Sequence, residues 1–281
     1  MNIIKNKTFD EERALYNIKD TKVLDCTFAG PADGESVLKE TRNIVVEDCK
    51  FSLRYPMWHA QKYQLSNSKL DELTRAPIWY AKDGIISGTE ILSVKALREC
   101  QNTTITSSSI TSAEFGWKCD GIKIENSTIV SEYMCFDSKN VQIKNLKFTG
   151  KYSFQYMENL TIEDSELDTK DAFWHSKNVL VINSVVKGEY LAWFSDGLTL
   201  VNCKIIGTQP FCYCKNLKIV DCEMVDTDLA FEYSEVDAVI KGNVESIKNP
   251  KSGKIVVDSV GKIINEDSIM ESNCVVEVKK K

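Results

Sequence analysis

The chain has 281 residues, 43% of them hydrophobic and 27% charged, and its formal net charge at pH 7 is −6. Nucleic acids and anionic membranes attract basic proteins, so this charge balance argues against both as partners. The N-terminal segment is polar and no long apolar run follows it, so we expect neither a signal peptide nor a membrane span and predict a cytoplasmic protein.

Residues 1–19 precede the first clear repeat and are predicted to form an N-terminal cap with half a coil. The segment Ala14–Asn17 aligns with Pro77–Tyr80 of a later repeat. That alignment is the reason for expecting part of a coil in the cap.

Residues 20–234 carry about eleven copies of the motif N-[LIV]-x-[ILV]-x-[ND]-[SC]-x-[ILVF]. From Asp83 to Asn216 each copy begins 19 residues after the one before it. Two earlier steps are longer, one through a Gly- and Pro-containing insertion near Gly30–Gly34 and one through two extra residues between Leu70 and Ala76. We number the positions of each repeat from the first residue of the motif. The first residues are Asp20, Asn43, Lys62, Asp83, Asn102, Gly121, Asn140, Asn159, Asn178, Gly197 and Asn216.

Each repeat has the pattern of short strands separated by corners. Position four is always aliphatic and position nine is apolar, with polar residues between them, which is typical of a strand with one buried face. Positions one and six are rich in Asn, Asp and Gly, which accept the left-handed backbone of a corner. Such strands bury their apolar positions only by stacking coil on coil at ~4.8 Å. The sequence therefore predicts an all-β, right-handed parallel β-helix, right-handed because parallel crossovers nearly always are.

Beyond Glu235 the repeat is lost, although residues 235–281 keep short strand-like runs. We expect them to form irregular β-coils that close the C-terminal end of the stack, where an open edge invites aggregation. Cap, regular coils and closing coils together predict one domain over residues 1–281.

The repeat resembles that of the pectin-lyase-like superfamily, and within it a family of uncharacterised bacterial proteins with the same 19-residue coil. The likeness extends over nearly the whole chain, including the segments Gly150–Tyr156 and Asp171–His175. It implies a parallel β-helix but no activity. The chain lacks the Asn-Thr-Asp, Asp-Asp and Gly-His-Gly motifs of polygalacturonases and the aspartate cluster with which pectate lyases hold calcium. Whether the protein is an enzyme stays open, and no cofactor is expected.

The second half of each repeat carries the candidate site. Position fifteen is non-polar throughout and should point inward, whereas position sixteen holds all five tryptophans as well as Lys39, Arg98 and Gln155 and should point outward. Position seventeen is polar or aromatic. Positions sixteen and seventeen form what we call the stripe, an array of aromatic and charged side chains along the helix axis. Its predicted ligand-binding residues are Arg98, Trp117, Tyr156, Trp174 and Trp193. The alternative is that the tryptophans form an internal aromatic ladder.

The stripe also contains weak candidates for catalysis. Glu99, Lys118, Asp137 and His175 are of the types used in general acid and base chemistry. The alternative for the first three is an ion-pair ladder from coil to coil. The ten cysteines mostly stand where other repeats carry serine, and the Cys-x-x-Cys spacing of zinc sites is absent, so we expect reduced core thiols and no metal.

Two functions follow from the stripe. An extended polysaccharide with a repeat of roughly 5 Å would match the coil spacing, so the protein is predicted to bind or process an oligosaccharide. The alternative is a non-catalytic scaffold whose flat faces engage a protein partner or a second copy of the chain.

Overall fold

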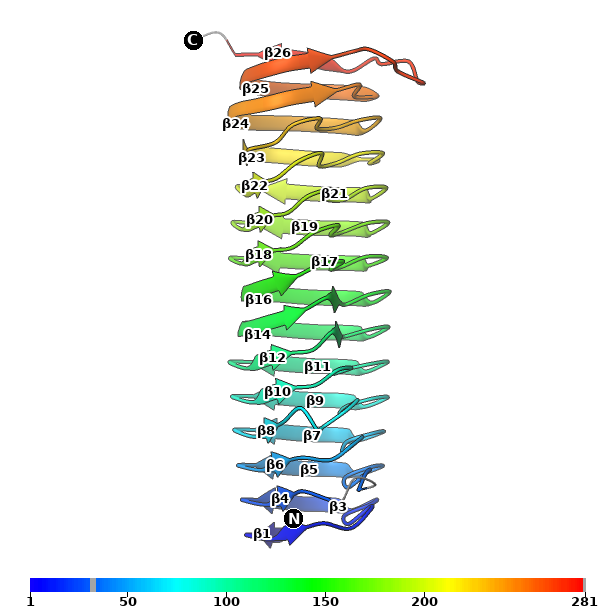
Figure 1. Cartoon of the computed structure of the whole chain (residues 1–281), viewed down its shortest axis with the longest axis vertical. Coiled ribbons are helices and arrows are strands. Elements are labelled where there is room, and N and C mark those ends of the chain that lie inside the picture. The colour runs from blue at the N-terminus through cyan, green and yellow to red at the C-terminus, as the bar shows by residue number, and fades with distance from the viewer. Residues whose placement is uncertain (31–33, 280–281) are drawn as a thin grey trace. The chain divides into compact units, whose positions relative to one another are not determined.

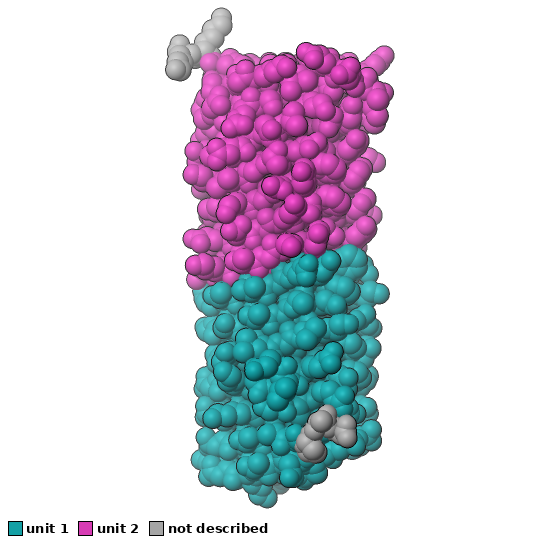
Figure 2. Space-filling view, viewed as in Figure 1, with its two compact units in different colours: residues 1–142 teal, residues 143–281 magenta. Residues whose placement is uncertain are grey.

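The computed structural model describes residues 1–30 and 34–279. The chain divides into two compact units, residues 1–142 (unit 1) and residues 143–281 (unit 2), which have different colours in Figure 2. Each unit is a stack of short parallel strands (Figure 1), and the described residues contain no helix, so none that could cross a membrane. The insertion predicted near Gly30–Gly34 falls largely on residues 31–33, outside the described ranges. One domain over residues 1–281 stays a prediction.

Unit 1 is built on two ladders of parallel strands. The main ladder contains β1 (Asn2–Lys5), β3 (Lys19–Leu24), β5 (Arg42–Glu47), β7 (Gln61–Ser66), β9 (Lys82–Ser87), β11 (Gln101–Thr106) and β14 (Asp120–Ser131). The second ladder contains β2 (Thr8–Phe9), β4 (Thr27–Phe28), β6 (Lys50–Phe51), β8 (Lys69–Leu70), β10 (Glu90–Leu92) and β12 (Ser109–Thr111), which pairs with the later part of β14. The pair β13 (Glu114–Phe115) and β15 (Tyr133–Met134) forms a small third sheet.

Unit 2 repeats the arrangement. Its main ladder contains β17 (Glu158–Glu163), β19 (Lys177–Ile182), β21 (Asp196–Val201), β23 (Leu217–Val225), β24 (Glu235–Lys248), β25 (Ser252–Ile264) and β26 (Val275–Val278). The second ladder contains β18 (Glu166–Asp168), β20 (Val185–Lys187) and β22 (Lys204–Ile206), and it begins at the end of β16 (Lys139–Gly150).

The register of the ladders places like positions of the repeat on top of one another. Val23 pairs with Val46 at position four, and both side chains are fully buried. At position nine the rings of Phe28 and Phe51 stack with their centroids 4.8 Å apart. The core is therefore a set of apolar columns, and the prediction of an all-β parallel β-helix is confirmed.

Several corners of each coil have positive φ. Positions one and six do so as predicted, with φ 52° at Asn102 and 49° at Ser107. Position seventeen is a further corner, with φ 51° at Glu99 and 52° at Lys118. Its backbone N–H groups bond to the next coil, as from Glu99 to the Trp117 carbonyl at 2.8 Å, which offsets part of the cost of about 1–2 kcal/mol of a left-handed residue. This corner was not predicted because most of its residues, apart from Asn17 and Asp137, are not Asn, Asp or Gly.

The prediction that residues 1–19 form a cap with half a coil is wrong. Residues 1–19 form a complete coil, since Asn2 pairs with Thr21 on the main ladder and Thr8 with Thr27 on the second. At the other end β24 to β26 extend the stack with irregular steps, including a register shift between Ile240 and Asn243. The two units together hold about 14 turns rather than eleven.

Candidate functional site

The stripe lies on the surface of the coils. In one coil of unit 1, Leu97 at position fifteen and Cys100 at position eighteen are buried, whereas Arg98 is half-buried and Glu99 is exposed. The same pattern recurs around Trp117 and around Trp174. In these coils position sixteen is partly covered and position seventeen projects into solvent. The prediction that position sixteen points outward is wrong for Cys212 and Phe231 in the last two regular coils, where both are fully buried.

All five indoles of position sixteen are tied to the backbone. Each Nε1 donates a hydrogen bond to a carbonyl of the following coil: Trp58 to Ala76, Trp79 to Lys95, Trp117 to Tyr133, Trp174 to Tyr190 and Trp193 to Gln209, at 2.6–3.1 Å. Two pairs stack face to face, with centroids 5.0 Å apart for Trp58 and Trp79 and 5.4 Å apart for Trp174 and Trp193, and Trp117 has Phe136 as its ring neighbour at 5.1 Å. The tryptophans thus form an aromatic ladder that is external, and a ligand would meet ring edges more than ring faces.

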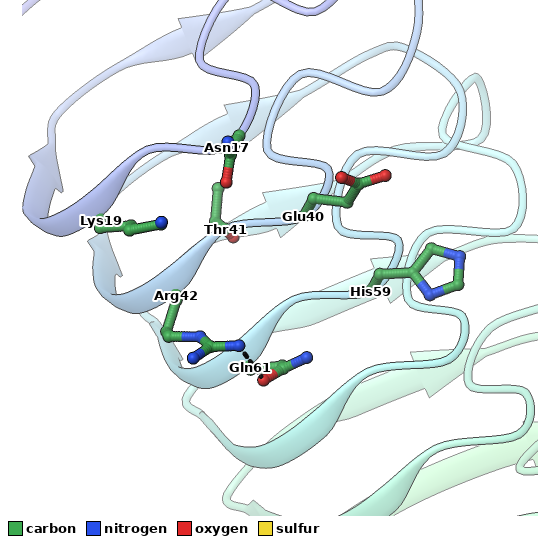
Figure 3. A pocket seen from close by; sticks show the side chains of 7 residues that line it. All are labelled: Asn17, Lys19, Glu40, Thr41, Arg42, His59 and Gln61. Atoms are coloured by element: carbon green, nitrogen blue, oxygen red, sulfur yellow. Dashed lines mark hydrogen bonds between the residues drawn. The ribbon is translucent and has the colours of Figure 1, made fainter.

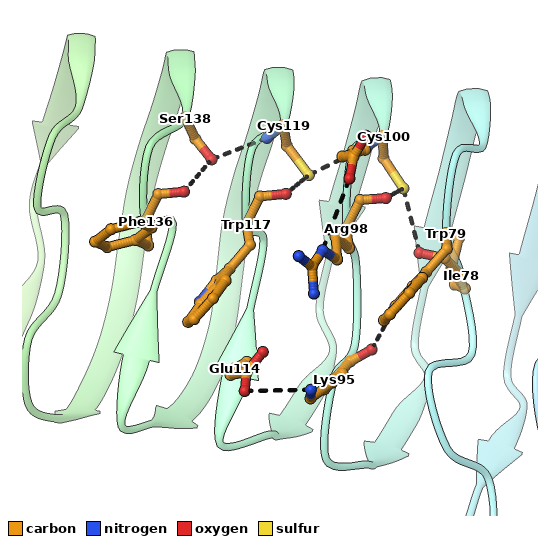
Figure 4. Close-up of polar contacts among 11 residues, drawn as sticks. Ile78, Trp79, Lys95, Arg98, Cys100, Glu114, Trp117, Cys119, Phe136 and Ser138 are labelled. Atoms are coloured by element: carbon orange, nitrogen blue, oxygen red, sulfur yellow. Dashed lines mark hydrogen bonds and ion pairs between the residues drawn. The ribbon is translucent and has the colours of Figure 1, made fainter.

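Arg98 replaces one rung of this ladder. Its guanidinium carbon lies 5.0 Å from the Trp79 ring and 5.7 Å from the Trp117 ring, within cation–π distance of both. Figure 4 shows Trp79, Arg98, Trp117 and Phe136 in a row on successive coils. The Arg98 Nε is 3.8 Å from a Glu99 carboxylate oxygen. Packing and charge therefore fix Arg98 within the stripe.

At position seventeen the rings also stack, in two separate runs. In unit 1, His59 lies on Tyr80 with centroids 4.9 Å apart. In unit 2, His175 lies between Tyr156 and Phe194, 5.0 Å from each. The predicted site residues thus form two groups. Arg98, Glu99, Trp117, Lys118 and Asp137 belong to unit 1, and Tyr156, Trp174, His175 and Trp193 belong to unit 2.

The ion-pair ladder that was the alternative interpretation of Glu99, Lys118 and Asp137 does not form. Glu99 pairs with Arg98 in its own coil, and no ion pair within 4.0 Å joins Lys118 to Glu99 or to Asp137 among the residues that the structure describes.

A groove runs beside position seventeen in unit 1. One hollow of about 360 Å³ (Figure 3) is lined by Asn17, Lys19, Glu40, Thr41, Arg42, His59 and Gln61. A second, of about 380 Å³, is lined by His59, Tyr80, Lys82, Glu99, Gln101, Lys118 and Asp120. His59 belongs to both hollows, which we together call the groove. One wall is position seventeen, and the other is the residue just before each motif, position nineteen.

Position nineteen is the part of the site that the sequence analysis missed. Its groove residues are Lys19, Arg42, Gln61, Lys82, Gln101 and Asp120. Arg42 donates a hydrogen bond from Nη2 to Gln61 Oε1 at 2.9 Å, which links two coils along this wall (Figure 3). The available signal was a run of long polar side chains two residues after position seventeen, at the first residue of each strand of the main ladder.

The thiols beneath the groove belong to the core. Cys100 and Cys119 at position eighteen are buried, and their Sγ atoms lie 3.3 Å from the Ile78 carbonyl and 3.4 Å from the Trp117 carbonyl (Figure 4). Burial raises the pKa of Cys119 well above its usual value, which makes it a poor nucleophile. Within residues 1–30 and 34–279 no three His, Cys, Asp or Glu side chains are placed to hold a metal ion.

A family model described as "Protein of unknown function (DUF3737)" matches residues 2–277. No curated protein sequence matches the chain. Among solved structures, the surface adhesin PfbA of Streptococcus pneumoniae is similar over 94% of this chain and 85% of that chain, with 10% identity and a TM-score of 0.53. A second PfbA structure gives 99% and 92% coverage, 8% identity and a TM-score of 0.51. The A-module of the Azotobacter vinelandii mannuronan C-5 epimerase AlgE4 gives 85% and 89% coverage, 9% identity and a TM-score of 0.36. At these identities the likeness to PfbA shows the fold alone.

Proposed function

The chain belongs to the DUF3737 family of proteins of unknown function, and we propose that it binds an extended oligosaccharide along the groove of unit 1. The observation that carries this proposal is the pair of hollows that meet at His59 and are lined by outward side chains of successive coils. Each coil contributes one residue from position seventeen and one from position nineteen. A linear ligand would therefore meet the same kind of wall at every step.

The spacing of the coils supports a polymer with a short repeat. Parallel strands stack at ~4.8 Å, close to the roughly 5 Å advance of one sugar in an extended chain. Successive sugars would then lie against successive coils without losing register.

The chemistry of the walls supports hydroxyl groups as the partner. Gln61 and Gln101 offer both donors and acceptors, Lys82 and Lys118 offer donors, and Glu99 and Asp120 offer acceptors. Two cations and two carboxylates balance in the hollow around Glu99, so no strong field of either sign selects a charged polymer.

The geometry favours binding over glycoside cleavage. Glu99 and Asp120 are the two carboxylates of one hollow, but their side chains are 43% and 40% exposed. A general acid for glycoside hydrolysis needs a carboxyl group whose pKa is raised by burial. Of the other catalytic candidates, Lys118 lines the groove, Asp137 does not and His175 lies in unit 2.

The test is isothermal titration of the full chain with neutral linear oligosaccharides. We expect the double variant K82A/Q101A, which removes two side chains of position nineteen, to weaken binding by about 10-fold or more, at ~1 kcal/mol per lost hydrogen bond. Q64A is the matched control, because Gln64 is also exposed on β7 but does not line the groove.

Equal affinities for the double variant and the control would contradict the proposal. So would a wild-type chain that binds no oligosaccharide.

A further inference from the structure

The outer face of the main ladder differs between the two units. Position five points outward next to the buried position four. In unit 1 the residues there on β5 to β14 are polar: Glu47, Ser66, Ser87, Thr106 and Glu125. In unit 2 five successive strands, β19, β21, β23, β24 and β25, carry an aliphatic residue at the corresponding place. These residues, which we call the aliphatic column, are Ile182, Val201, Val220, Val239 and Val256.

The aliphatic column is continuous and accessible. Ile182 pairs with Val201 and Val201 with Val220, and Val239 pairs with Val256 further along the ladder. Val220 and Val239 follow the paired core residues Ile219 and Ala238 and are 42% and 38% exposed. Single exposed valines are ordinary, whereas a row of five spanning about 19 Å is a contiguous apolar surface of the kind that marks an interface.

Two opposite charges flank the middle of the column. Lys218 on β23 and Asp237 on β24 are register partners two residues before Val220 and Val239, and both are exposed. They line the same hollow of about 220 Å³, so they project on the same side of the sheet. Neither has an ion-pair partner within 4.0 Å among the described residues, so both charges are available to a partner.

We propose that a second copy of the chain packs on this face, with the two aliphatic columns antiparallel across a two-fold axis. The axis lies between β23 and β24, in the plane of the interface and parallel to the strands. It reverses the order of the coils and keeps position three opposite position three. Val220 then meets the partner's Val239, and Val201 meets the partner's Val256. Lys218 meets the partner's Asp237 at one side of the axis, and the same contact repeats at the other side.

Charge complementarity selects a second copy as the occupant. A two-fold contact must be self-complementary, because each residue on one side of the axis meets the residue related to it on the other. Lys218 and Asp237 satisfy this with opposite signs, and Val201, Val220, Val239 and Val256 satisfy it with like shapes. Lys254 and Glu277 at the edge of the same face form an ion pair with each other at 2.7 Å, so Lys218 and Asp237 set both the register and the direction of packing.

The test is sedimentation equilibrium of the full chain over a range of concentrations. We expect the wild-type chain to show a reversible monomer–dimer equilibrium. K218D and D237K each place like charges opposite one another at two contacts and are expected to raise the dimer dissociation constant by more than about 100-fold. The double variant K218D/D237K restores opposite charges and is expected to bring the dissociation constant back to within a few-fold of the wild-type value.

I85E is the matched control. Ile85 is 46% exposed on β9, on the outer face of the main ladder of unit 1, so its substitution should leave the dimer intact. The circular dichroism spectrum of each variant establishes that it is folded. A wild-type chain that stays monomeric contradicts the proposal and assigns the face to another partner, and a double variant as weak as the single ones contradicts the two-fold register. Because the groove lies in unit 1, neither result depends on whether the protein binds an oligosaccharide.

Discussion

Asp171 in unit 2 is an acidic residue that the coil buries. Its side chain lies at a corner with φ 50° and is 8% exposed. Burial raises the pKa of this carboxyl group, and Lys170 next to it offsets only part of the effect. The charged form is therefore less favourable in the folded chain than in the unfolded one.

We predict that D171N stabilises the protein at pH 7. A raised pKa means that the folded state binds the proton more tightly, so the wild-type chain loses stability as pH rises through the window above the ordinary carboxyl pKa of about 4. Asparagine has no charge and also accepts positive φ. Thermal unfolding should give a higher Tm for the variant at pH 7 and a difference that shrinks as the pH approaches 3. A Tm advantage that is the same at both pH values would contradict this explanation.

Tyr63 and Gly84 form a large and small pair between adjacent coils. They are register partners at position two, and a Cβ atom built on Gly84 would lie 2.1 Å from the Tyr63 ring. Tyr63 is 1% exposed, so its ring has no free space into which to move. The tyrosine occupies the volume that the glycine leaves.

We predict that G84V destabilises the protein by about 1–3 kcal/mol through overpacking. Y63V alone should cost about 2–5 kcal/mol because it leaves a cavity. The double variant Y63V/G84V should be more stable than the sum of the two single effects, as measured by urea denaturation. Additive effects would mean that the two residues do not share one space.

At the scale of elements, the tryptophan ladder links each coil to the next. Each indole N–H donates to a carbonyl of the following coil, which lies at a corner for Gln209, bonded by Trp193 at 3.0 Å, and in β15 for Tyr133, bonded by Trp117. These side-chain bonds add to the backbone bonds between coils, so the tryptophans stabilise the fold apart from any ligand.

We predict that W193F lowers the free energy of unfolding by about 1 kcal/mol, since phenylalanine retains the stacking but loses the hydrogen bond. Chemical denaturation measures the change. W193F should leave oligosaccharide affinity unaltered, because Trp193 lies in unit 2. A loss of affinity without a loss of stability would instead make Trp193 a ligand contact, as its residue type first indicated.

For the whole molecule, the sequence predicted the repeat, the buried columns and the exposure of position seventeen, because each depends on a residue type that recurs at a fixed spacing. The coil of residues 1–19 was missed because most of its side chains are exposed and position seven holds Lys7 in place of a small residue, although Ile4 and Phe9 continue the apolar columns and the backbone pairs normally. Ring orientation at Trp174 and Trp193 depends on side-chain rotamers at a corner, which spacing does not determine. Right-handed winding stays a prediction.

The groove could not be predicted from the sequence because one wall is a corner and the other is the first residue of the strand that follows it. Position seventeen was predicted as part of a site because it combines aromatic and charged residues. Position nineteen was not, because lysine, arginine and glutamine are common on the exposed side of a strand. Only the path of the backbone around the corner makes the two walls face one space. The aliphatic column of unit 2 was overlooked for a related reason, since valine and isoleucine in a strand are expected in the core.

The most direct test of the proposed function is the dependence of affinity on ligand length. Position seventeen lines the groove with six residues on successive coils: Asn17, Glu40, His59, Tyr80, Glu99 and Lys118. If one sugar lies against each coil, titration calorimetry with a series of neutral oligosaccharides should show affinity rising up to about six units and then levelling off. Affinity that does not change with length, or no binding at any length, would contradict a groove that reads an extended chain.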